Sequence, residues 1–215
     1  MYHLRDVILF RYIARLLQWI LLLLLPFYLL IRLSVYLYQD YQLSPSLSIL
    51  VSSVAMMIVL VLYISLIVSR FTGRLGRWRA FKSRAYLAVF FVWAFCAYGL
   101  IYLSSSHAKT DEVRREYTQL HPILRLATGT LILADPDMVI TDASRSLGDY
   151  DRMGIPRNQS SLHFKQPSGY VHAVDLRTSD RSEFRNSLLE WTYRSLGFET
   201  LRHAGTADHL HVALR

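Results

Sequence analysis

Three long apolar runs constrain this sequence more than any other feature. They extend over Leu16–Tyr36, Leu47–Val68 and Tyr86–Leu103, and the second and third contain no charged residue. A helix needs about 20 mostly apolar residues to cross the hydrocarbon core of a bilayer. We therefore expect three transmembrane helices. Arg32 lies near the end of the first run, where its long side chain reaches the membrane interface.

The first run could instead be a cleaved signal peptide, because Arg5, Arg11 and Arg15 precede it. However, no A-x-A-like cleavage site follows the run, and two further apolar runs do. Pro26 inside the run is tolerated in a membrane helix when neighbouring helices compensate for the lost hydrogen bond. We interpret the run as an uncleaved membrane anchor.

Basic residues are distributed unevenly over the connections between these runs. The connection 39–46 contains none, whereas the connection between the second and third runs contains Arg70, Arg74, Arg77, Arg79, Lys82 and Arg84. Short loops rich in Lys and Arg remain in the cytoplasm. The pattern predicts a multi-pass protein of the cytoplasmic (inner) membrane with a cytoplasmic N-terminus. Its C-terminal part is then periplasmic or extracellular.

The same distribution bears on several other classes of function. The net charge of +8 would suggest a nucleic-acid partner, but its concentration in one loop is explained by topology, so we expect none. The second and third runs contain no ionisable residue that would mark an ion path. Cys96 is the only cysteine, which excludes a disulfide within the chain and a metal site built from thiolates.

Composition changes near Ser106, and we divide the chain into a membrane domain, 1–106, and a soluble domain, 107–215. The soluble part predicts an α+β fold with a small, mainly antiparallel sheet. The expected helices are Asp111–Ala127, a short one near Asp149, and one from Asp180 to Gly197 whose apolar face is Phe184, Leu188, Trp191 and Leu196. The expected strands are Thr130–Ala134, Met138–Thr141, a hairpin of Leu162–Phe164 with Tyr170–Leu176 around Gln166–Gly169, Phe198–Arg202 and Leu210–Leu214.

Histidines and carboxylates are concentrated late in the soluble part. His209 and His211 alternate with Leu210 and Val212 on the final strand, so both histidines lie on its exposed face. Nitrogen and oxygen ligands without cysteine suit a zinc site with an open position. The whole set is His163, His172, Asp175, His203, Asp208, His209 and His211.

Part of this set resembles a known family. Ser161-Leu162-His163, Gly169 and Ala173-Val174-Asp175 resemble the S-x-H-x-x-G-x-A-x-D motif of the zinc D-alanyl-D-alanine peptidases. These LAS-type murein metallopeptidases include carboxypeptidases, dipeptidases and endopeptidases, and share the hedgehog-like fold. Asp208-His209-Leu210-His211 is similar to their terminal E/D-x-x-H or H-x-H, and Ile140–Ser146 to their S-G-Y-R-S segment.

The resemblance covers roughly residues 120–215 and implies a role for each matching residue. It makes His163, Asp175 and His211 zinc ligands. It makes Asp208 the general base, with His209 as an alternative base or transition-state stabiliser. Arg145 would hold a substrate carboxylate, and Ser161 would support the site. The implied protein is a bacterial, membrane-anchored zinc metallopeptidase that hydrolyses D-amino-acid-containing peptidoglycan stem peptides, as a D,D-carboxypeptidase or endopeptidase.

The sequence departs from the family pattern at two points. Eleven residues separate His163 from Asp175 where the family has six, and His172 is a possible substitute ligand. The expected base is Asp where many members have Glu. These departures leave open a catalytically inactive domain of the same fold that binds wall peptides or a partner protein. A membrane scaffold with a purely structural C-terminal domain is a further alternative.

Overall fold

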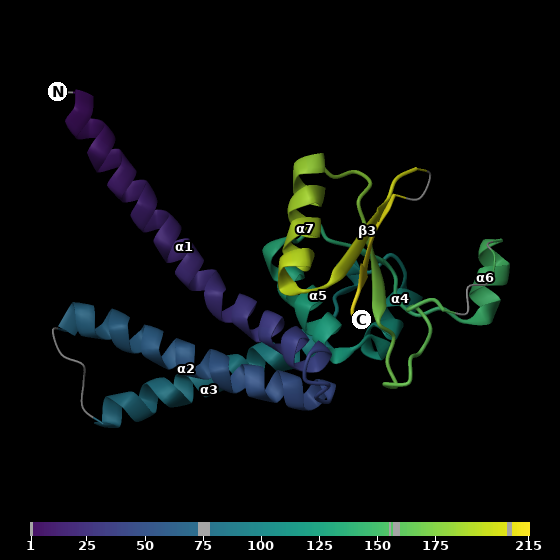
Figure 1. The fold of residues 1–215 in the computed structure, drawn as a ribbon, viewed down its shortest axis with the longest axis horizontal. Coiled ribbons are helices and arrows are strands. Elements are labelled where there is room, and N and C mark those ends of the chain that lie inside the picture. The colour runs from purple at the N-terminus through teal and green to yellow at the C-terminus, as the bar shows by residue number, and fades with distance from the viewer. Residues whose placement is uncertain (1, 73–77, 155, 157–159, 206–207) are drawn as a thin grey trace.

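Three long helices form the N-terminal half. The computed structural model describes residues 2–72, 78–154, 156, 160–205 and 208–215 (Figure 1). Arg74 and Arg77 of the expected basic connection, and Thr206 of the expected last turn, lie outside the described residues. The long helices are α1 (Tyr2–Gln39), α2 (Pro45–Thr72) and α3 (Trp78–Ile101).

Two of these helices are long and apolar enough to cross a membrane, over Pro45–Arg70 and Phe81–Ile101. They correspond to the second and third expected spans. The first expected span lies in α1, where Phe10–Ile20 and Leu24–Gln39 are bent by 43°. It adds a third crossing helix when this bent pair is counted as one span.

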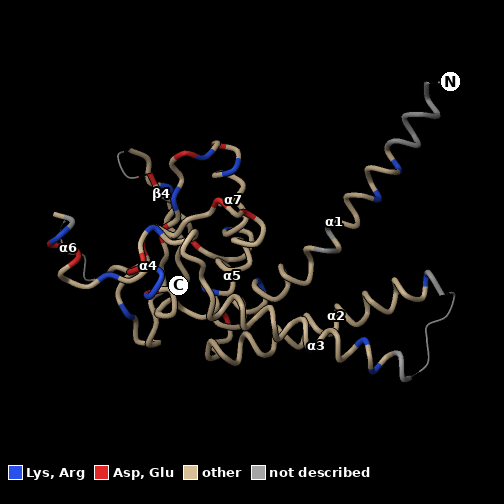
Figure 2. Tube along the Cα trace, turned by 180° about the vertical axis from the view of Figure 1, so that it is seen from behind, with Lys and Arg blue, Asp and Glu red and all other residues tan. Residues whose placement is uncertain are grey.

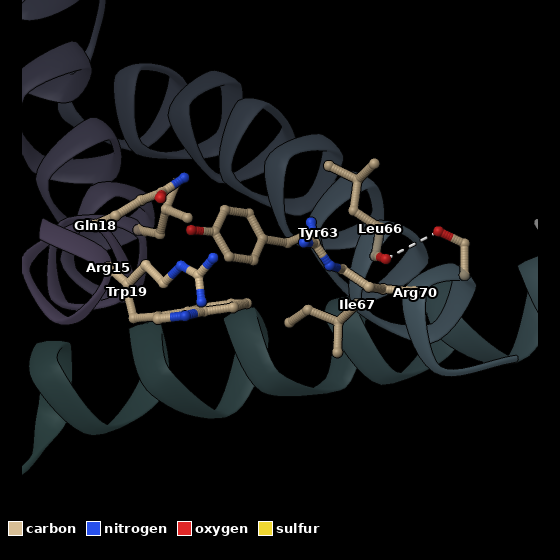
Figure 3. A pocket seen from close by; sticks show the side chains of 9 residues that line it. Arg15, Gln18, Trp19, Tyr63, Leu66, Ile67 and Arg70 are labelled. Carbon is tan, nitrogen blue, oxygen red and sulfur yellow. Dashed lines mark hydrogen bonds between the residues drawn. The ribbon is translucent and has the colours of Figure 1, made fainter. Parts of the chain in front are cut away.

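Basic residues mark the ends of these helices that lie away from the sheet (Figure 2). A cavity of about 700 Å³ opens there between α1 and α2. Arg15 and Arg70 line it together with Trp19 and Tyr63, and its described lining includes no carboxylate (Figure 3). Arg15 and Arg70 therefore lie at the same end of the helical half, as expected for one membrane face.

The C-terminal half is a four-stranded antiparallel sheet with helices, in the strand order β1-β2-β4-β3. The mainly antiparallel sheet predicted from the sequence is confirmed, and the last two expected strands match β3 and β4 to within a residue at each end. The elements are η1 (Ser105–His107), α4 (Asp111–Glu116), η2 (Tyr117–Gln119), α5 (Pro122–Ala134), β1 (Ile140–Asp142), α6 (Leu147–Met153), β2 (Ala173–Arg177), α7 (Glu183–Leu196), β3 (Glu199–His203) and β4 (His209–Ala213).

The segment before β1 differs from the prediction. The expected helix Asp111–Ala127 is interrupted, because Pro122 has no N–H to donate and instead occupies the first turn of α5. His121 caps this helix, its Nδ1 accepting a hydrogen bond from the Ile123 N–H at 3.3 Å. The prediction of a strand at Thr130–Ala134 is wrong, because this segment continues α5.

The expected hairpin around Gln166–Gly169 is also only partly formed. The turn is present, with the Gly169 N–H bonded to the Gln166 carbonyl at 2.8 Å and Gly169 at φ 85°. Its first arm, however, makes only an isolated bridge between Lys165 and Val171. Regular strand begins at Ala173, where β2 pairs with β4 instead.

Helix α7 presents a different face to the core from the one predicted. Ser182, rather than Asp180, is its N-cap, and Gly197 ends it in the left-handed conformation as expected. Its fully buried residues are Asn186, Leu189, Tyr193 and Leu196. The Asn186 side chain donates to the Thr178 carbonyl at 2.9 Å, which allows a polar residue in the core. Phe184, Leu188 and Trp191 are exposed, so three of the four residues of the predicted core face are wrong.

The two halves share one apolar core. Its buried residues run without interruption from Leu30 in α1, through Val92 in α3 and Leu126 in α5, to Leu210 in β4. A Cβ added to Gly129 of α5 would lie 2.9 Å from the Cα of Gly99 in α3, so the two helices touch through their glycines. Helix α5 therefore rests on the end of α3 and supports the sheet.

Candidate metal centre

The centre of the sheet places two of the expected ligands opposite each other. Asp175 of β2 and His211 of β4 are register partners. Their strand neighbours Leu176 and Leu210 are fully buried in the core shared with α5 and α7. Because side chains alternate along a strand, Asp175 and His211 point to the opposite face.

The third expected ligand, His163, comes from the loop before β2. Its own N–H bonds to Ser161 Oγ at 3.3 Å, and its carbonyl accepts from the Arg145 N–H at 3.0 Å. The carbonyl of Leu162 accepts from the His172 N–H at 2.9 Å. The loop is therefore fixed on both sides, and the turn at Gln166–Gly169 takes up the additional residues between His163 and Asp175.

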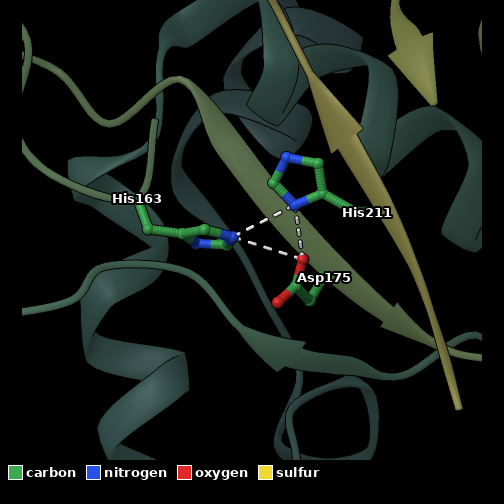
Figure 4. A group of neighbouring side chains, drawn as sticks. All are labelled: His163, Asp175 and His211. Atoms are coloured by element: carbon green, nitrogen blue, oxygen red, sulfur yellow. Dashed lines mark hydrogen bonds and ion pairs between the residues drawn. The ribbon is translucent and has the colours of Figure 1, made fainter. Parts of the chain in front are cut away.

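Three donor atoms converge at this point (Figure 4). Nε2 of His163 lies 3.2 Å from Nδ1 of His211 and 3.2 Å from Oδ1 of Asp175. Nδ1 of His211 lies 2.8 Å from the same carboxylate oxygen. The side chains of His163 and Asp175 are buried, whereas His211 is partly exposed and forms the open side of the site.

A backbone carbonyl sets the orientation of the His163 ring. Nδ1 of His163 lies 2.8 Å from the carbonyl oxygen of Ala143, to which it donates. The proton is thereby held on Nδ1, and the lone pair of Nε2 points at Asp175 and His211. A hydrogen bond of this kind is what orients histidines that bind metals.

The Asp175 carboxylate favours a positive charge on the side that faces His163. Burial alone would raise the pKa of Asp175, but its contacts with His163 and His211 outweigh burial and hold this pKa far below its usual value. Burial opposes the charged form of His163, yet hydrogen bonding and attraction to Asp175 raise its pKa. A proton or a metal cation can supply the charge.

The arrangement fits a tetrahedral cation. With metal–ligand distances near 2.0–2.1 Å, neighbouring ligands lie about 3.3 Å apart. The distances between the three donors are 3.2, 3.2 and 2.8 Å, so only small shifts are needed. This group could hold a metal ion with three protein ligands, leaving one position toward the partly exposed side.

Arg145 lies beside the group but is engaged within the protein. Its guanidinium bonds Oδ2 of Asp175 at 2.9 Å and also the carboxylate of Asp142. Asp142 is the register partner of Asp175 across β1 and β2. The guanidinium thus fixes the oxygen of Asp175 that does not face His163 and His211.

The two candidates for proton transfer occupy different positions. Nε2 of His209 lies 3.7 Å from Oδ2 of Asp175, and its ring stacks on His203 with centroids 4.6 Å apart. Asp208 lies in the turn between β3 and β4, where its carboxylate accepts a hydrogen bond from the Gly205 N–H. Its other oxygen lies 3.8 Å from Arg202. His209 is therefore next to the metal group, while Asp208 is bonded within its turn.

Other neighbours of the site have roles that the sequence did not predict. His172, considered as a substitute ligand, instead bonds Ser168 and the Leu214 carbonyl. Glu116 accepts from the Ser144 N–H at 3.3 Å and so holds the segment that carries Ala143 and Arg145. A carbonyl such as that of Ala143 leaves no signal in a sequence, whereas Asp142, which lies within the S-G-Y-R-S-like segment Ile140–Ser146, could have been identified.

Comparisons with protein-family models, with curated proteins and with solved structures find no match for this chain.

Proposed function

We propose that this protein is a membrane-anchored zinc peptidase that hydrolyses D-amino-acid-containing peptides of peptidoglycan, as a D,D-carboxypeptidase or endopeptidase. The observation that carries the proposal is the convergence of His163, Asp175 and His211, with three donor atoms at mutual distances of 2.8–3.2 Å. His163 and Asp175 of the quoted motif have eleven residues between them, and their convergence with His211 supports the proposal. The D-alanyl-D-alanine peptidase fold is part of the same proposal.

The residues of the site have three proposed roles: metal binding, proton transfer and orientation of Asp175. His163, Asp175 and His211 hold zinc, which when bound polarises a carbonyl and activates water for attack. His209 is the nearer candidate for proton transfer, because Asp208 would first have to leave its hydrogen bond to Gly205. Arg145 keeps Asp175 oriented and reaches a substrate carboxylate only after exchanging a present partner.

The proposed compartment follows from the positions of the charges. Arg15 and Arg70 lie at the end of the helical half away from the sheet, as the cytoplasmic ends of spans would. The sheet then lies on the periplasmic or extracellular side of a bacterial cytoplasmic membrane. Peptidoglycan stem peptides are the substrates of this compartment that suit the site.

A second function is a domain of the same fold that binds wall peptides or a partner protein without catalysis. It is supported by the engagement of Asp208 with Gly205 and of Arg145 with two carboxylates. In that case zinc would stabilise a binding surface. Asp208, the expected general base, would instead stabilise the turn between β3 and β4.

Metal content of the full-length protein in detergent tests the shared part of both functions. We expect about one zinc per chain, and loss of it in His163→Ala and in His211→Ala, because removal of one of three ligands weakens binding severely. His203→Ala is the matched control, since this histidine stacks on His209 but lies outside the group of three. Zinc retained in both ligand variants would contradict the assignment.

Turnover then separates the two functions. The zinc-loaded protein is incubated with a stem peptide that ends in D-alanyl-D-alanine and with crosslinked muropeptides. Cleavage that stops on chelation and returns with zinc supports the peptidase. Stoichiometric zinc and peptide binding without cleavage of either substrate would support the binding domain instead.

A further inference from the structure

Helix α7 carries an exposed apolar face that its own domain does not use. Phe184, Leu188 and Trp191 are 77%, 50% and 66% exposed. Their spacing of four and three residues places them on one side of the helix. The core-facing residues Asn186, Leu189 and Tyr193 occupy roughly the opposite side. The exposed face is therefore an apolar stripe that points away from the core of the domain.

The C-terminal end of α7 is held against the first membrane helix. The hydroxyl of Tyr28 donates to the Ser195 carbonyl at 2.9 Å. A Cβ on Gly197 would lie 2.9 Å from Val35 and 3.1 Å from the Arg32 guanidinium, so the chain meets α1 without space for a side chain. Helix α7 thus has a fixed position relative to α1.

This contact also fixes the depth of α7 relative to a bilayer. The stretch 16–31 of α1 contains no charge, and Arg32 is the next charged residue along the helix. Beyond Tyr28, the apolar residues Leu30, Ile31 and Val35 are buried against protein, so the part of this run that is free to face lipid ends near Tyr28. An aromatic residue at this point suits the boundary between acyl chains and head groups. Because Tyr28 bonds Ser195, the end of α7 lies at the level of this boundary.

The direction of α7 completes the geometry. In Figure 1, α7 runs across the direction of α2 and α3, on the side of the sheet nearest to the free part of α1. A bilayer crossed by α2 and α3 therefore has its surface roughly along α7 rather than across it. The face opposite the sheet is the one that can lie on this surface.

We propose that α7 lies in the membrane interface, with Phe184, Leu188 and Trp191 inserted between the lipid head groups and the upper acyl chains. Aromatic and leucine side chains on one face of an amphipathic helix are what such interfacial helices use. The exposed face of α7 is covered by the same bilayer that α2 and α3 cross. The bilayer is the expected partner because this face adjoins the contact that α7 already makes with α1. A second copy of the chain is the competing occupant.

Spin labels on the full-length protein in liposomes of phosphatidylcholine and phosphatidylglycerol test this proposal. The only cysteine, Cys96, is replaced in a Cys96→Ala background, and a label is attached through Leu188→Cys. The matched control is Leu147→Cys in α6, because Leu147 is also 50% exposed but lies at the end of the domain farthest from α1. Far-UV circular dichroism and the thermal unfolding midpoint check that both variants retain their fold.

Collision rates with oxygen, which partitions into lipid, and with a water-soluble nickel chelate give the result. We expect the ratio of oxygen to nickel collisions at position 188 to exceed that at position 147 severalfold. Equal ratios would show that the face is in water and would overturn the proposal. Protection of position 188 from both reagents, with a dimer mass in detergent, would overturn it in favour of a second copy.

Discussion

At the scale of single residues, two buried histidines show how neighbours determine charge. His163 faces the Asp175 carboxylate, and its pKa is raised. His121 is surrounded by the rings of Tyr38, His172 and Tyr170, with Arg125 nearby. Burial, followed by repulsion from His172 and Arg125, lowers its pKa to about 3. The surroundings of His163 therefore favour a positive charge, whereas those of His121 keep it neutral.

Neutral His121 should make the protein sensitive to acid. In the unfolded chain this group binds a proton below its ordinary pKa of 6.5, whereas folded His121 stays neutral until about pH 3. Stability is therefore lost as the pH falls from 6.5 toward 3, by up to about 1.4 kcal/mol per pH unit for one proton. His121→Asn, which can still cap α5 but does not titrate, should reduce this slope.

Thermal unfolding midpoints between pH 7 and pH 5, measured in detergent without added metal, check this expectation. Wild type and variant share all other acid-sensitive groups, including His172, so the difference between their slopes reports His121. Parallel curves would show that His121 does not contribute.

The identity of the residues at the candidate site was easier to predict than the hydrogen bonds and ion pairs that they make. His163, Asp175 and His211 could be selected because their chemical types and order match a motif. The engagement of Asp208 by Gly205 and of Arg145 by Asp142 could not, since each depends on where a turn or a neighbouring strand directs a side chain. Residue types predicted which three side chains lie together, but not the hydrogen bonds that Asp208 and Arg145 make.

At the scale of elements, one error lies in α5, which packs against α3. Thr130–Ala134 was expected as a strand because a short apolar run has no visible period. It is helical because it continues α5, whose preceding turns are buried and contact α3, although within the segment itself only Ile132 is buried. The two strands farthest along the chain, β3 and β4, were predicted well, since their alternation depends only on the domain's own core.

The glycine contact between α3 and α5 gives a prediction at this scale. In Gly129→Ala, the new Cβ would lie 2.9 Å from backbone of Gly99 and 3.3 Å from the hydroxyl of Tyr117, so the helices must separate. Overpacking of this kind costs roughly 1–3 kcal/mol. The thermal midpoint in detergent should fall accordingly.

Gly148→Ala is the control for that variant. Gly148 is in the short helix α6, and its added Cβ meets nothing closer than Ser146 Oγ at 3.7 Å. Alanine should be neutral or stabilising there by up to about 1 kcal/mol, because glycine disfavours helix. Equal midpoints in both alanine variants would contradict a close contact between α3 and α5.

At the scale of the whole molecule, composition changes near Ser106 while apolar packing continues across that point. The buried residues of α1 and α3 belong to the same core as those of the sheet. Sequence patterns describe which segments are apolar, but they do not show that two such regions pack together. The position of the sheet on the ends of the spans could therefore not be predicted.

Cysteine labelling in cells tests the arrangement across the membrane. In the Cys96→Ala background, Tyr41→Cys lies in the connection between α1 and α2, where Tyr41 is exposed, and Lys82→Cys lies near the start of α3. A maleimide that cannot cross the membrane should label position 41 from outside and position 82 only after permeabilisation. The reverse pattern would place the sheet and the candidate site in the cytoplasm.

The support that α3 gives to α5 has a consequence for when the protein becomes competent. Asp175 and His211 lie on strands whose buried face packs in the same core as α5, and α5 contacts α3, one of the helices long and apolar enough to cross a membrane. In a chain that has not inserted into a bilayer, α3 would not be in place to support α5 and the sheet. Assembly of the candidate metal centre would thus follow insertion of the helical half into the bilayer, and any activity that the proposed site supports would arise only in the inserted chain.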